Sequence, residues 1–363
     1  MKLKYLLPVL LCMLLPLCAL ADVTPNPVVS RKAPAYALGS QSSASAGNDM
    51  YYNTFWKGKA PEDWLAYDLS AVEEAHRAQV AVVWYSPSTF DQVGNYAYRS
   101  GAPTSYTIEL NSAPGGECPT EGWEEAVRVE GSTLGSRVHV LDMTGYHWIR
   151  LRVTEVDGKA DGTCQVNLDV HDISGGMSDS WLFLGDSITA GGMGNAYGTG
   201  YATYISRLRP AYFPVAINGG LGGLTSRDGK NHIDTWLADF PGQFVGIAYG
   251  TNDAWGNQMG TKRFRENMAY MIEAVLKSGK TPVVPTIPWA KEPGVGKHEG
   301  SYNQVIEELY AAYPEVIPGP DFYSLFEQHP EYLSTDGVHP NNTGYEEMRR
   351  VWAVEMAERV YGE

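Results

Sequence analysis

The chain has 363 residues, of which 44% are hydrophobic and 19% are charged. This length accommodates two ordinary domains, and this balance of apolar and charged residues is typical of packed globular structure rather than of disorder. The 42 acidic residues outnumber the 27 basic ones, which gives a formal net charge of −15. Because a negative surface repels phosphate backbones and anionic lipid, the composition disfavours binding to nucleic acid or to membrane surfaces.

Residues 1–21 have the three parts of a secretory signal peptide. Lys2 and Lys4 precede an apolar run over residues 5–17, and small residues follow at Ala19 and Ala21. The run is too short to span a membrane and contains prolines, so we expect cleavage after Ala21 rather than a spanning helix. No other segment is apolar over the length that a spanning helix needs. We therefore predict a secreted or periplasmic protein with no insertion into a membrane.

Two cysteines, Cys118 and Cys164, lie outside the predicted signal peptide. In an oxidising compartment such a pair is more often a disulfide than a catalytic or metal site. We therefore predict a disulfide between Cys118 and Cys164, and the alternative is two buried free thiols.

Residues 49–174 are predicted to form a β-sandwich. Residues 22–48 before them are rich in Pro, Ser and Ala, which predicts a linker or an irregular edge. Short apolar segments then follow, several of them alternating between apolar and polar residues, and turn residues separate them. This pattern is typical of antiparallel strands that face a core. The predicted strands are residues 80–85, 106–110, 138–141, 148–153 and 166–170.

Residues 180–363 have a different pattern, in which strands and helices alternate. The Gly- and Ser-rich segment 175–180 predicts a joint between two domains. Short continuous apolar runs are typical of buried parallel strands, and longer runs of helical period follow them. The predicted strands are residues 181–184, 215–217, 244–248 and 282–285, and helices are predicted over 261–278 and from Thr343 onward. This alternation predicts a doubly wound α/β domain whose ligand site lies at the carboxyl ends of the strands.

Four short blocks, three of them directly after predicted strands and one before the last helix, carry residues suited to chemistry. They are Gly185-Asp186-Ser187-Ile188, residues 218–223 (Asn-Gly-Gly-Leu-Gly-Gly), Gly250-Thr251-Asn252-Asp253 and Asp336-Gly337-Val338-His339. Each block alone has an ordinary structural explanation, such as a helix N-cap or a glycine turn. Their occurrence in this order at one edge of one predicted sheet instead indicates an enzyme with a serine nucleophile and a histidine base.

These blocks make residues 180–363 similar to the SGNH (GDSL-type) hydrolases, which carry four such blocks in this order on a flavodoxin-like, three-layer α/β/α fold. The resemblance implies that Ser187 is the nucleophile, that His339 is its base and that Asp336 orients His339. Ile188 stands where the family has the leucine of its GDSL motif, a change that touches no reacting atom.

The same resemblance implies an oxyanion hole made by Ser187, Gly223 and Asn252. No Gly-x-Ser-x-Gly motif surrounds Ser187, so an ordinary α/β-hydrolase is not indicated. The eight histidines form no cluster with the spacing of metal ligands, so we expect no cofactor for catalysis.

Residues 26–173 resemble the discoidin (F5/8 type C) family, a jelly roll that often binds glycans. The resemblance rests on an N-D-x-x-x-x-T-x-W block at 48–56 and a W-x-x-x-D-L block at 64–69. It implies a structural calcium ion with Asp49 and Thr54 among its ligands, although Asn167 stands where the family usually has a glutamate. The alternative is that Asp49 caps a turn and Trp56 fills the core.

We therefore predict an exported serine esterase that removes small acyl groups, O-acetyl in particular, from an acylated carbohydrate. A jelly roll followed by an SGNH domain is similar to the layout of carbohydrate esterases of family two. One alternative is a lipase, lysophospholipase or arylesterase that acts on longer acyl chains. Another is a glycan-binding protein whose hydrolase domain is vestigial. Trp255 and Trp289 are candidate walls of the substrate site, or else core residues.

Overall fold

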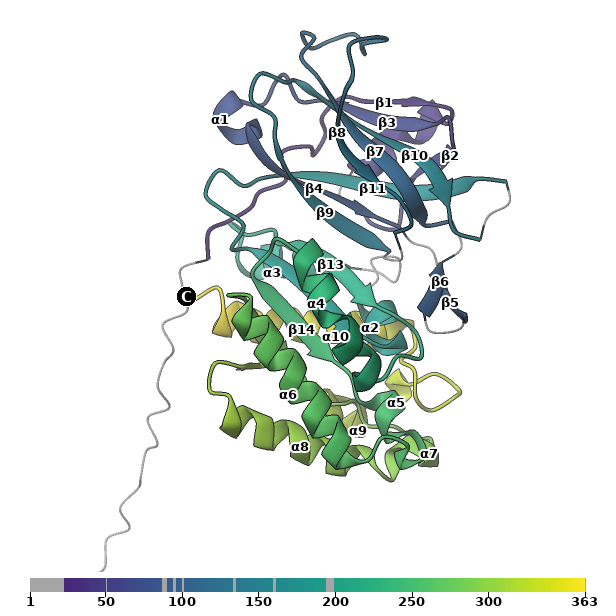
Figure 1. Cartoon of the computed structure of the whole chain (residues 1–363), viewed down its shortest axis with the longest axis vertical. Coiled ribbons are helices and arrows are strands. Elements are labelled where there is room, and N and C mark those ends of the chain that lie inside the picture. Colours follow the sequence, from purple (N-terminus) through teal and green to yellow (C-terminus); the bar gives the residue numbers. More distant parts are fainter. Residues whose placement is uncertain are drawn as a thin grey trace, which may run out of the picture.

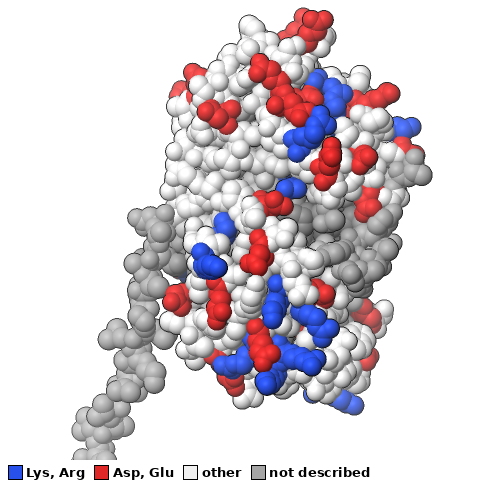
Figure 2. Space-filling model, viewed as in Figure 1, with Lys and Arg blue, Asp and Glu red and all other residues white. Residues whose placement is uncertain are grey.

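The computed structural model describes residues 23–49, 51–86, 90–93, 96–99, 101–132, 135–158, 161–193 and 199–362. The predicted signal peptide lies outside these residues. The chain forms an N-terminal domain of antiparallel sheets and a C-terminal domain with a parallel sheet and helices (Figure 1). Figure 2 shows acidic side chains spread over both domains, with basic ones among them. In the part of the chain that is described, no helix combines the length and apolar character needed to cross a bilayer.

Two antiparallel sheets share one core in the N-terminal domain. The first has the order β1 (Ala35–Leu38), β3 (Trp64–Asp68), β10 (Trp148–Val156), β7 (Pro103–Asn111) and β8 (Glu124–Val129). The second has the order β2 (Trp56–Lys59), β11 (Thr163–Asp172), β4 (Gln79–Tyr85) and β9 (Ser136–Asp142). Leu65 and Ile149 of the first sheet and Trp84 and Leu168 of the second are fully buried in this core. The five strands predicted here are confirmed, and the connectivity of a jelly roll stays a prediction.

Three smaller elements complete the N-terminal domain. Helix α1 (Glu74–Arg77) precedes β4, and β5 (Phe90–Val93) pairs with β6 (Tyr96–Arg99) as a separate antiparallel hairpin.

The segment predicted as a linker or irregular edge, residues 22–48, is an ordered part of this domain over its described residues. Strand β1 pairs with β3 in antiparallel register, and the 3-10 helix η1 (Gln41–Gly47) follows it. The Asn48 side chain then donates hydrogen bonds to the carbonyl oxygens of Ser30 (2.7 Å) and Ala33 (3.1 Å). Because β1 is a short edge strand with half-exposed residues, it lacks the alternation of apolar and polar residues that reveals a strand in a sequence.

Both remaining cysteines are free thiols, so the predicted disulfide between Cys118 and Cys164 is wrong. Cys164 lies in β11 opposite Gly58, and burial raises the pKa of its thiol to about 12. Cys118 lies in the connection between β7 and β8, where its Sγ is 4.0 Å from the carbonyl oxygen of Pro119. Cys164 thus belongs to the second sheet, whereas Cys118 lies in a loop that joins two strands of the first sheet. A count of cysteines carries no information about that separation.

The C-terminal domain is built on a parallel sheet with the order β13 (Val215–Gly220), β12 (Ser180–Gly185), β14 (Phe244–Ala248), β15 (Thr281–Val284) and β16 (Ile317–Pro318). Numbered along the chain, this is the order 2-1-3-4-5 of flavodoxin-like sheets, which bind ligands at the carboxyl ends of their strands. Every residue of β12 is buried, as expected of a central parallel strand. The predicted strands of this domain are confirmed, whereas β16 was not foreseen.

Helices pack in two groups on this sheet. Helix α6 (Thr261–Lys277) contacts both α4 (Ser226–Asp239) and α8 (Glu299–Ala312), and α10 (Asn342–Arg359) contacts both α2 (Ser187–Gly192) and α3 (Tyr201–Leu208). Figure 1 shows α4 and α6 in front of the sheet and α10 behind it. The shorter elements α5 (Thr251–Ala254), η3 (Trp255–Asn257), α7 (Pro293–Gly296), α9 (Phe322–Gln328) and η4 (Pro330–Tyr332) lie in the connections. Helices α6 and α10 confirm the predicted ones.

The two domains are in direct contact. Ser136 at the start of β9 accepts a hydrogen bond from the backbone N–H of Asn218 in β13 at 2.9 Å. The ring of Tyr52 stacks on that of Phe213, with 6.5 Å between ring centroids. Asn218 begins the glycine-rich block, so the N-terminal domain supports the strand that leads into the candidate site.

Candidate active site

Ser187 stands at a tight turn where β12 ends and α2 begins. The Asp186 side chain caps the helix by accepting the N–H of Ile188 at 2.9 Å. Gly185 is required because a Cβ atom there would lie 2.1 Å from Thr189 Oγ1 and 2.6 Å from the carbonyl oxygen of Ala248. The turn therefore places Ser187 at a helix N-terminus on the carboxyl edge of the sheet, where backbone N–H groups are free to bind an anion.

Ser187, His339 and Asp336 form a continuous hydrogen-bonded chain. Ser187 Oγ lies 2.8 Å from His339 Nε2, and His339 Nδ1 lies 2.7 Å from Asp336 Oδ2. With Asp336 ionised, the network assigns the Nδ1–H tautomer, in which Nε2 accepts the serine proton. The three residues come from opposite ends of the hydrolytic half of the sequence, and the fold brings them together as predicted.

The second oxygen of Asp336 holds its own loop. Asp336 Oδ1 accepts the N–H groups of Val338 and His339, both at 2.9 Å, and the Ser334 hydroxyl at 2.8 Å. Partial burial by itself raises the pKa of Asp336, but the hydrogen bonds from Val338, His339 and Ser334 outweigh it and hold that pKa well below its usual range. The carboxylate is therefore ionised and fixed beside His339.

A neighbouring segment supports this catalytic loop. Gly337 has a φ of 72°, a conformation that favours glycine. Its carbonyl oxygen accepts the N–H groups of Lys291 (2.8 Å) and Glu292 (3.1 Å), just before α7. The loop that carries Asp336 and His339 is thus tied to the segment that leads into α7.

The residues predicted for the oxyanion hole also meet. Asn252 Nδ2 donates one hydrogen bond to the carbonyl oxygen of Leu224 at 2.9 Å, which leaves its second hydrogen for another acceptor. Gly223, next to Leu224, has a φ of 75°, and no hydrogen bond within the described part of the chain engages its N–H. The N–H of Leu221 donates to the carbonyl oxygen of Gly185 at 3.0 Å, which joins this turn to the nucleophile turn.

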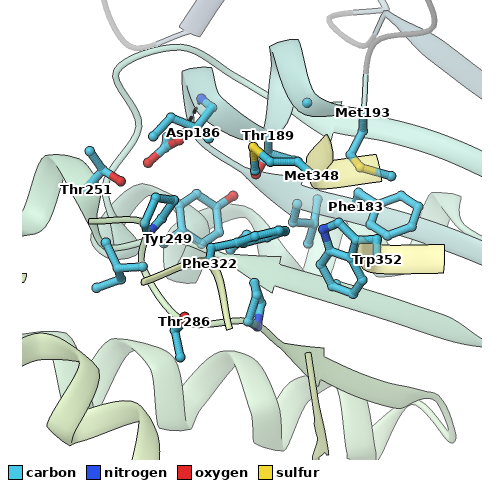
Figure 3. A pocket seen from close by; sticks show the side chains of 18 residues that line it. Phe183, Asp186, Thr189, Met193, Tyr249, Thr251, Thr286, Phe322, Met348 and Trp352 are labelled. Atoms are coloured by element: carbon cyan, nitrogen blue, oxygen red, sulfur yellow. Dashed lines mark hydrogen bonds between the residues drawn. The ribbon is translucent and has the colours of Figure 1, made fainter. Parts of the chain in front are cut away.

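A narrow, mostly apolar pocket adjoins the turn that carries Ser187, because Asp186 and Ile188 line it (Figure 3). Its walls include Phe183, Met193, Phe322, Met348 and Trp352, whereas neither Ser187 nor His339 lines it. Asp186 and Tyr249 face it from the strand ends, and burial raises the pKa of Asp186 to about 7. The pocket is therefore part of the core, and Asp186 acts as a helix cap rather than as a group that faces substrate.

Over residues 183–347 the chain matches the GDSL-like lipase/acylhydrolase family. The C-terminal domain is a GDSL/SGNH hydrolase domain. An acetylxylan esterase of Geobacillus stearothermophilus is 27% identical over 220 residues, which is 50% of this chain and 95% of that enzyme. An uncharacterized lipoprotein of Bacillus subtilis (strain 168), YqeF, is 36% identical over 92 residues, which is 24% of this chain and only 37% of that protein's length.

Among solved structures, the lipase/acylhydrolase from Enterococcus faecalis is similar to the hydrolase domain. It shares 26% sequence identity with a TM-score of 0.43, over 50% of this chain and 96% of that one.

The predicted calcium ligands of the N-terminal domain do not fit a calcium ion. Asp49 accepts the N–H of Tyr51 (2.8 Å) and the hydroxyl of Thr54 (2.7 Å), as in the turn-capping alternative, and Trp56 is fully buried. Asn167 Nδ2 donates to the carbonyl oxygens of Ala46 (2.9 Å) and Thr54 (2.8 Å). Because calcium requires converging oxygen ligands, a nitrogen that faces these carbonyls is the wrong donor. Within the described residues, no group of three or more His, Cys, Asp or Glu side chains is arranged to hold a metal ion.

Sequence reasoning missed the residues that support the hydrolase site. Ser334 and Lys291 hold the catalytic loop, and Asp253 joins the two oxyanion loops through Ser226. For Asp253 a signal existed, since it directly follows Asn252 and is the only charged residue of segment 240–261. Trp289 packs half-buried against the core, whereas Trp255 is 45% exposed.

Proposed function

We propose that this protein is a serine esterase that hydrolyses small acyl esters, O-acetyl in particular, on a carbohydrate. The observation that carries the proposal is the chain of hydrogen bonds from Ser187 Oγ through the His339 ring to Asp336 Oδ2, at 2.8 and 2.7 Å. Hydroxyl, imidazole and carboxylate in this order are what a serine needs to act as a nucleophile near neutral pH.

The acylation step follows from the geometry. Ser187 Oγ attacks the ester carbonyl carbon while His339 Nε2 takes the hydroxyl proton, and Asp336 stabilises the imidazolium that forms. The oxyanion accepts hydrogen bonds from the N–H groups of Ser187 and Gly223 and from Asn252 Nδ2. The tetrahedral intermediate then collapses, His339 gives its proton to the departing sugar hydroxyl, and the acyl group stays on Ser187.

Deacylation repeats these roles with water. His339 takes a proton from a water molecule that attacks the acyl-enzyme, and the same three donors bind the second oxyanion. Collapse of this intermediate breaks the bond to Ser187 Oγ, which regains a proton from His339, and releases the carboxylic acid.

Two observations support a carbohydrate substrate. A relative that matches half of this chain is named an acetylxylan esterase. The N-terminal domain also resembles a glycan-binding family in its blocks at 48–56 and 64–69. We further propose that residues 1–21 direct export, which would bring the enzyme to extracellular or periplasmic polysaccharides.

The substrate class is tested by measuring acetate release from a panel of acetylated polysaccharides, with the Ser187→Ala variant as the control. We expect release from at least one acetylated polysaccharide and none by the variant. Hydrolysis of p-nitrophenyl octanoate faster than p-nitrophenyl acetate, with no acetate from any polysaccharide, would instead support a lipase or arylesterase. Binding to glycans without hydrolysis of any ester would support the vestigial alternative.

A further inference from the structure

One large aromatic side chain stands exposed close to the oxyanion loop. Trp255 follows Asn252 at the end of α5 and is 45% exposed, whereas most tryptophans of this chain that the structure describes are buried. A single exposed aromatic residue needs no explanation by itself. Its position and its rigidity, however, distinguish Trp255 from an ordinary surface residue.

The backbone that carries Trp255 is fixed on several sides. Gly256 and Asn257 follow with φ values of 59° and 54°, so two successive residues hold a left-handed conformation. The Tyr302 hydroxyl lies 2.9 Å from Asn257 Oδ1 and accepts the N–H of Gly260 at 2.9 Å. Gln258 Nε2 donates to the carbonyl oxygen of Asn252 at 2.5 Å. Since this loop is already ordered, contact with a ligand would cost little conformational entropy.

The indole of Trp255 packs against α7, which adjoins the support of the catalytic loop. A Cβ atom on Gly294 of α7 would come within 3.2 Å of Trp255 Nε1, so the indole edge packs over a position that has no side chain. The segment before α7 is the one whose Lys291 and Glu292 N–H groups bind the carbonyl oxygen of Gly337 in the catalytic loop. Trp255 thus follows Asn252 by three residues in the chain, and its indole packs against the helix whose preceding segment supports the Asp336–His339 loop.

We propose that Trp255 is the platform on which a sugar ring of the substrate packs while its acyl group is bound at Ser187. This inference rests on the proposed function and adds the residue that recognises the alcohol part of the ester. An indole offers a broad apolar face to the C–H groups of a sugar ring, and its N–H can donate to a hydroxyl. Trp289 is less suited to this role because it is half-buried against the core.

The test compares Trp255→Ala with the wild-type full-length chain on two substrates that share the acetyl group. One is an acetylated xylo-oligosaccharide, and the other is vinyl acetate, whose leaving group has no ring. Tyr270→Ala is the matched control, because Tyr270 on α6 is also exposed, at 40%. Its hydroxyl donates to Asp234 and its ring lies beneath Lys230, and both of these residues belong to α4. Trp255→Phe retains an aromatic face and serves as the conservative variant.

We expect Trp255→Ala to lower kcat/KM about tenfold on the oligosaccharide, mainly through KM. Vinyl acetate hydrolysis should stay unchanged, Trp255→Phe should recover most of the loss, and Tyr270→Ala should match the wild type on both substrates. Equal losses on both substrates would show a structural role and overturn the inference, as would an unchanged KM for the oligosaccharide. If the wild type hydrolyses vinyl acetate but no acetylated saccharide, the proposed carbohydrate substrate is wrong. The proposed role of Trp255 is then wrong as well, because it depends on that substrate.

Discussion

The carboxylate of Asp253 accepts the backbone N–H of Ser226 at 2.9 Å and so joins the two loops that hold the oxyanion donors. Asp253 directly follows Asn252, and Ser226 begins α4 shortly after Gly223. The Ser226 hydroxyl also donates to Asp253 and accepts from Asn267 Nδ2 at 3.0 Å. Because Asp253 and Ser226 are fully buried, water cannot replace this link.

Asp253→Ala should therefore lower both stability and catalysis. A buried N–H left without a partner costs about 1–3 kcal/mol of unfolding free energy. A shift of the oxyanion donors should lower kcat by about 10-fold to 100-fold with little change in KM, because they act on the transition state. Urea unfolding and steady-state kinetics measure the two effects, with Asp234→Ala on the surface of α4 as the control. A variant that loses stability but keeps the wild-type kcat would show that Asp253 does not position the donors.

Asn252→Ala removes one donor of the proposed oxyanion hole. We expect kcat to fall by about 10²–10³-fold, or about 3–4 kcal/mol of transition-state stabilisation, with KM nearly unchanged. Asn252→Asp keeps the shape of the side chain but places a carboxylate against the oxyanion. Its kcat should therefore be no higher than that of Asn252→Ala. Steady-state kinetics with p-nitrophenyl acetate checks both, and a fully active Asn252→Asp enzyme would remove Asn252 from the oxyanion hole.

Asp336→Asn hardly changes the shape of the side chain, but we expect it to lower kcat strongly. The three donors on Oδ1 fix which end of the new side chain is oxygen, so the Asn nitrogen must face His339 Nδ1. That ring nitrogen must then accept, which puts the proton on Nε2 and prevents it from taking the Ser187 proton. We expect a loss in kcat of roughly 10³-fold.

Comparison with Asp336→Ala separates the effect of the wrong His339 tautomer from the effect of losing the hydrogen bonds that hold the loop. Asp336→Ala leaves the tautomer free but removes the acceptor of the Ser334, Val338 and His339 hydrogen bonds. It should therefore have a lower melting temperature than Asp336→Asn and a higher kcat. The opposite order of kcat values would contradict the assigned hydrogen-bond pattern.

A buried carboxyl at the joint between the domains makes stability depend on pH. Asp179 is fully buried, accepts the Tyr361 hydroxyl at 2.7 Å, and burial raises its pKa from 3.8 to about 7. The folded state therefore favours the protonated acid, so the stability that Asp179 contributes is complete below about pH 4 and is lost as pH rises through about 7.

Asp179→Asn has no charge to lose, so its gain in stability over the wild type should be small at pH 4 and larger at pH 8. We expect a gain at pH 8 of about 1.4 kcal/mol or more, the equivalent of one pKa unit. Urea unfolding at both pH values measures it, and Asp234→Asn at an exposed position should show no such dependence. A difference between Asp179→Asn and the wild type that stays constant with pH would argue against a neutral Asp179.

Sequence patterns predicted those parts of the molecule that depend on local order. The apolar runs of β12 and β14 and the helical stripe of α6 are recognisable because their residues repeat with the period of the element. The catalytic blocks were placed together because parallel strands bring their carboxyl ends to one edge, and Ser187, His339 and Asn252 do lie there.

Contacts between elements were not predictable in the same way. The bond between Asp253 and Ser226 depends on how α4 and α5 meet, and no spacing in the sequence encodes that meeting. The disulfide prediction failed for the same reason, since Cys164 lies in a strand of the second sheet and Cys118 in a loop between two strands of the first. Asn167 shows a further limit, because whether an amide or an ion satisfies the carbonyls of Ala46 and Thr54 depends on the direction of one side chain.

We propose that Ser187 is the nucleophile of an ester hydrolase. The most direct measurement is the hydrolysis of p-nitrophenyl acetate by the wild-type chain and by Ser187→Ala, with folding of the variant checked by its melting temperature. We expect the wild type to hydrolyse this ester and the folded variant to release p-nitrophenol no faster than buffer does. Activity of Ser187→Ala equal to that of the wild type would contradict it.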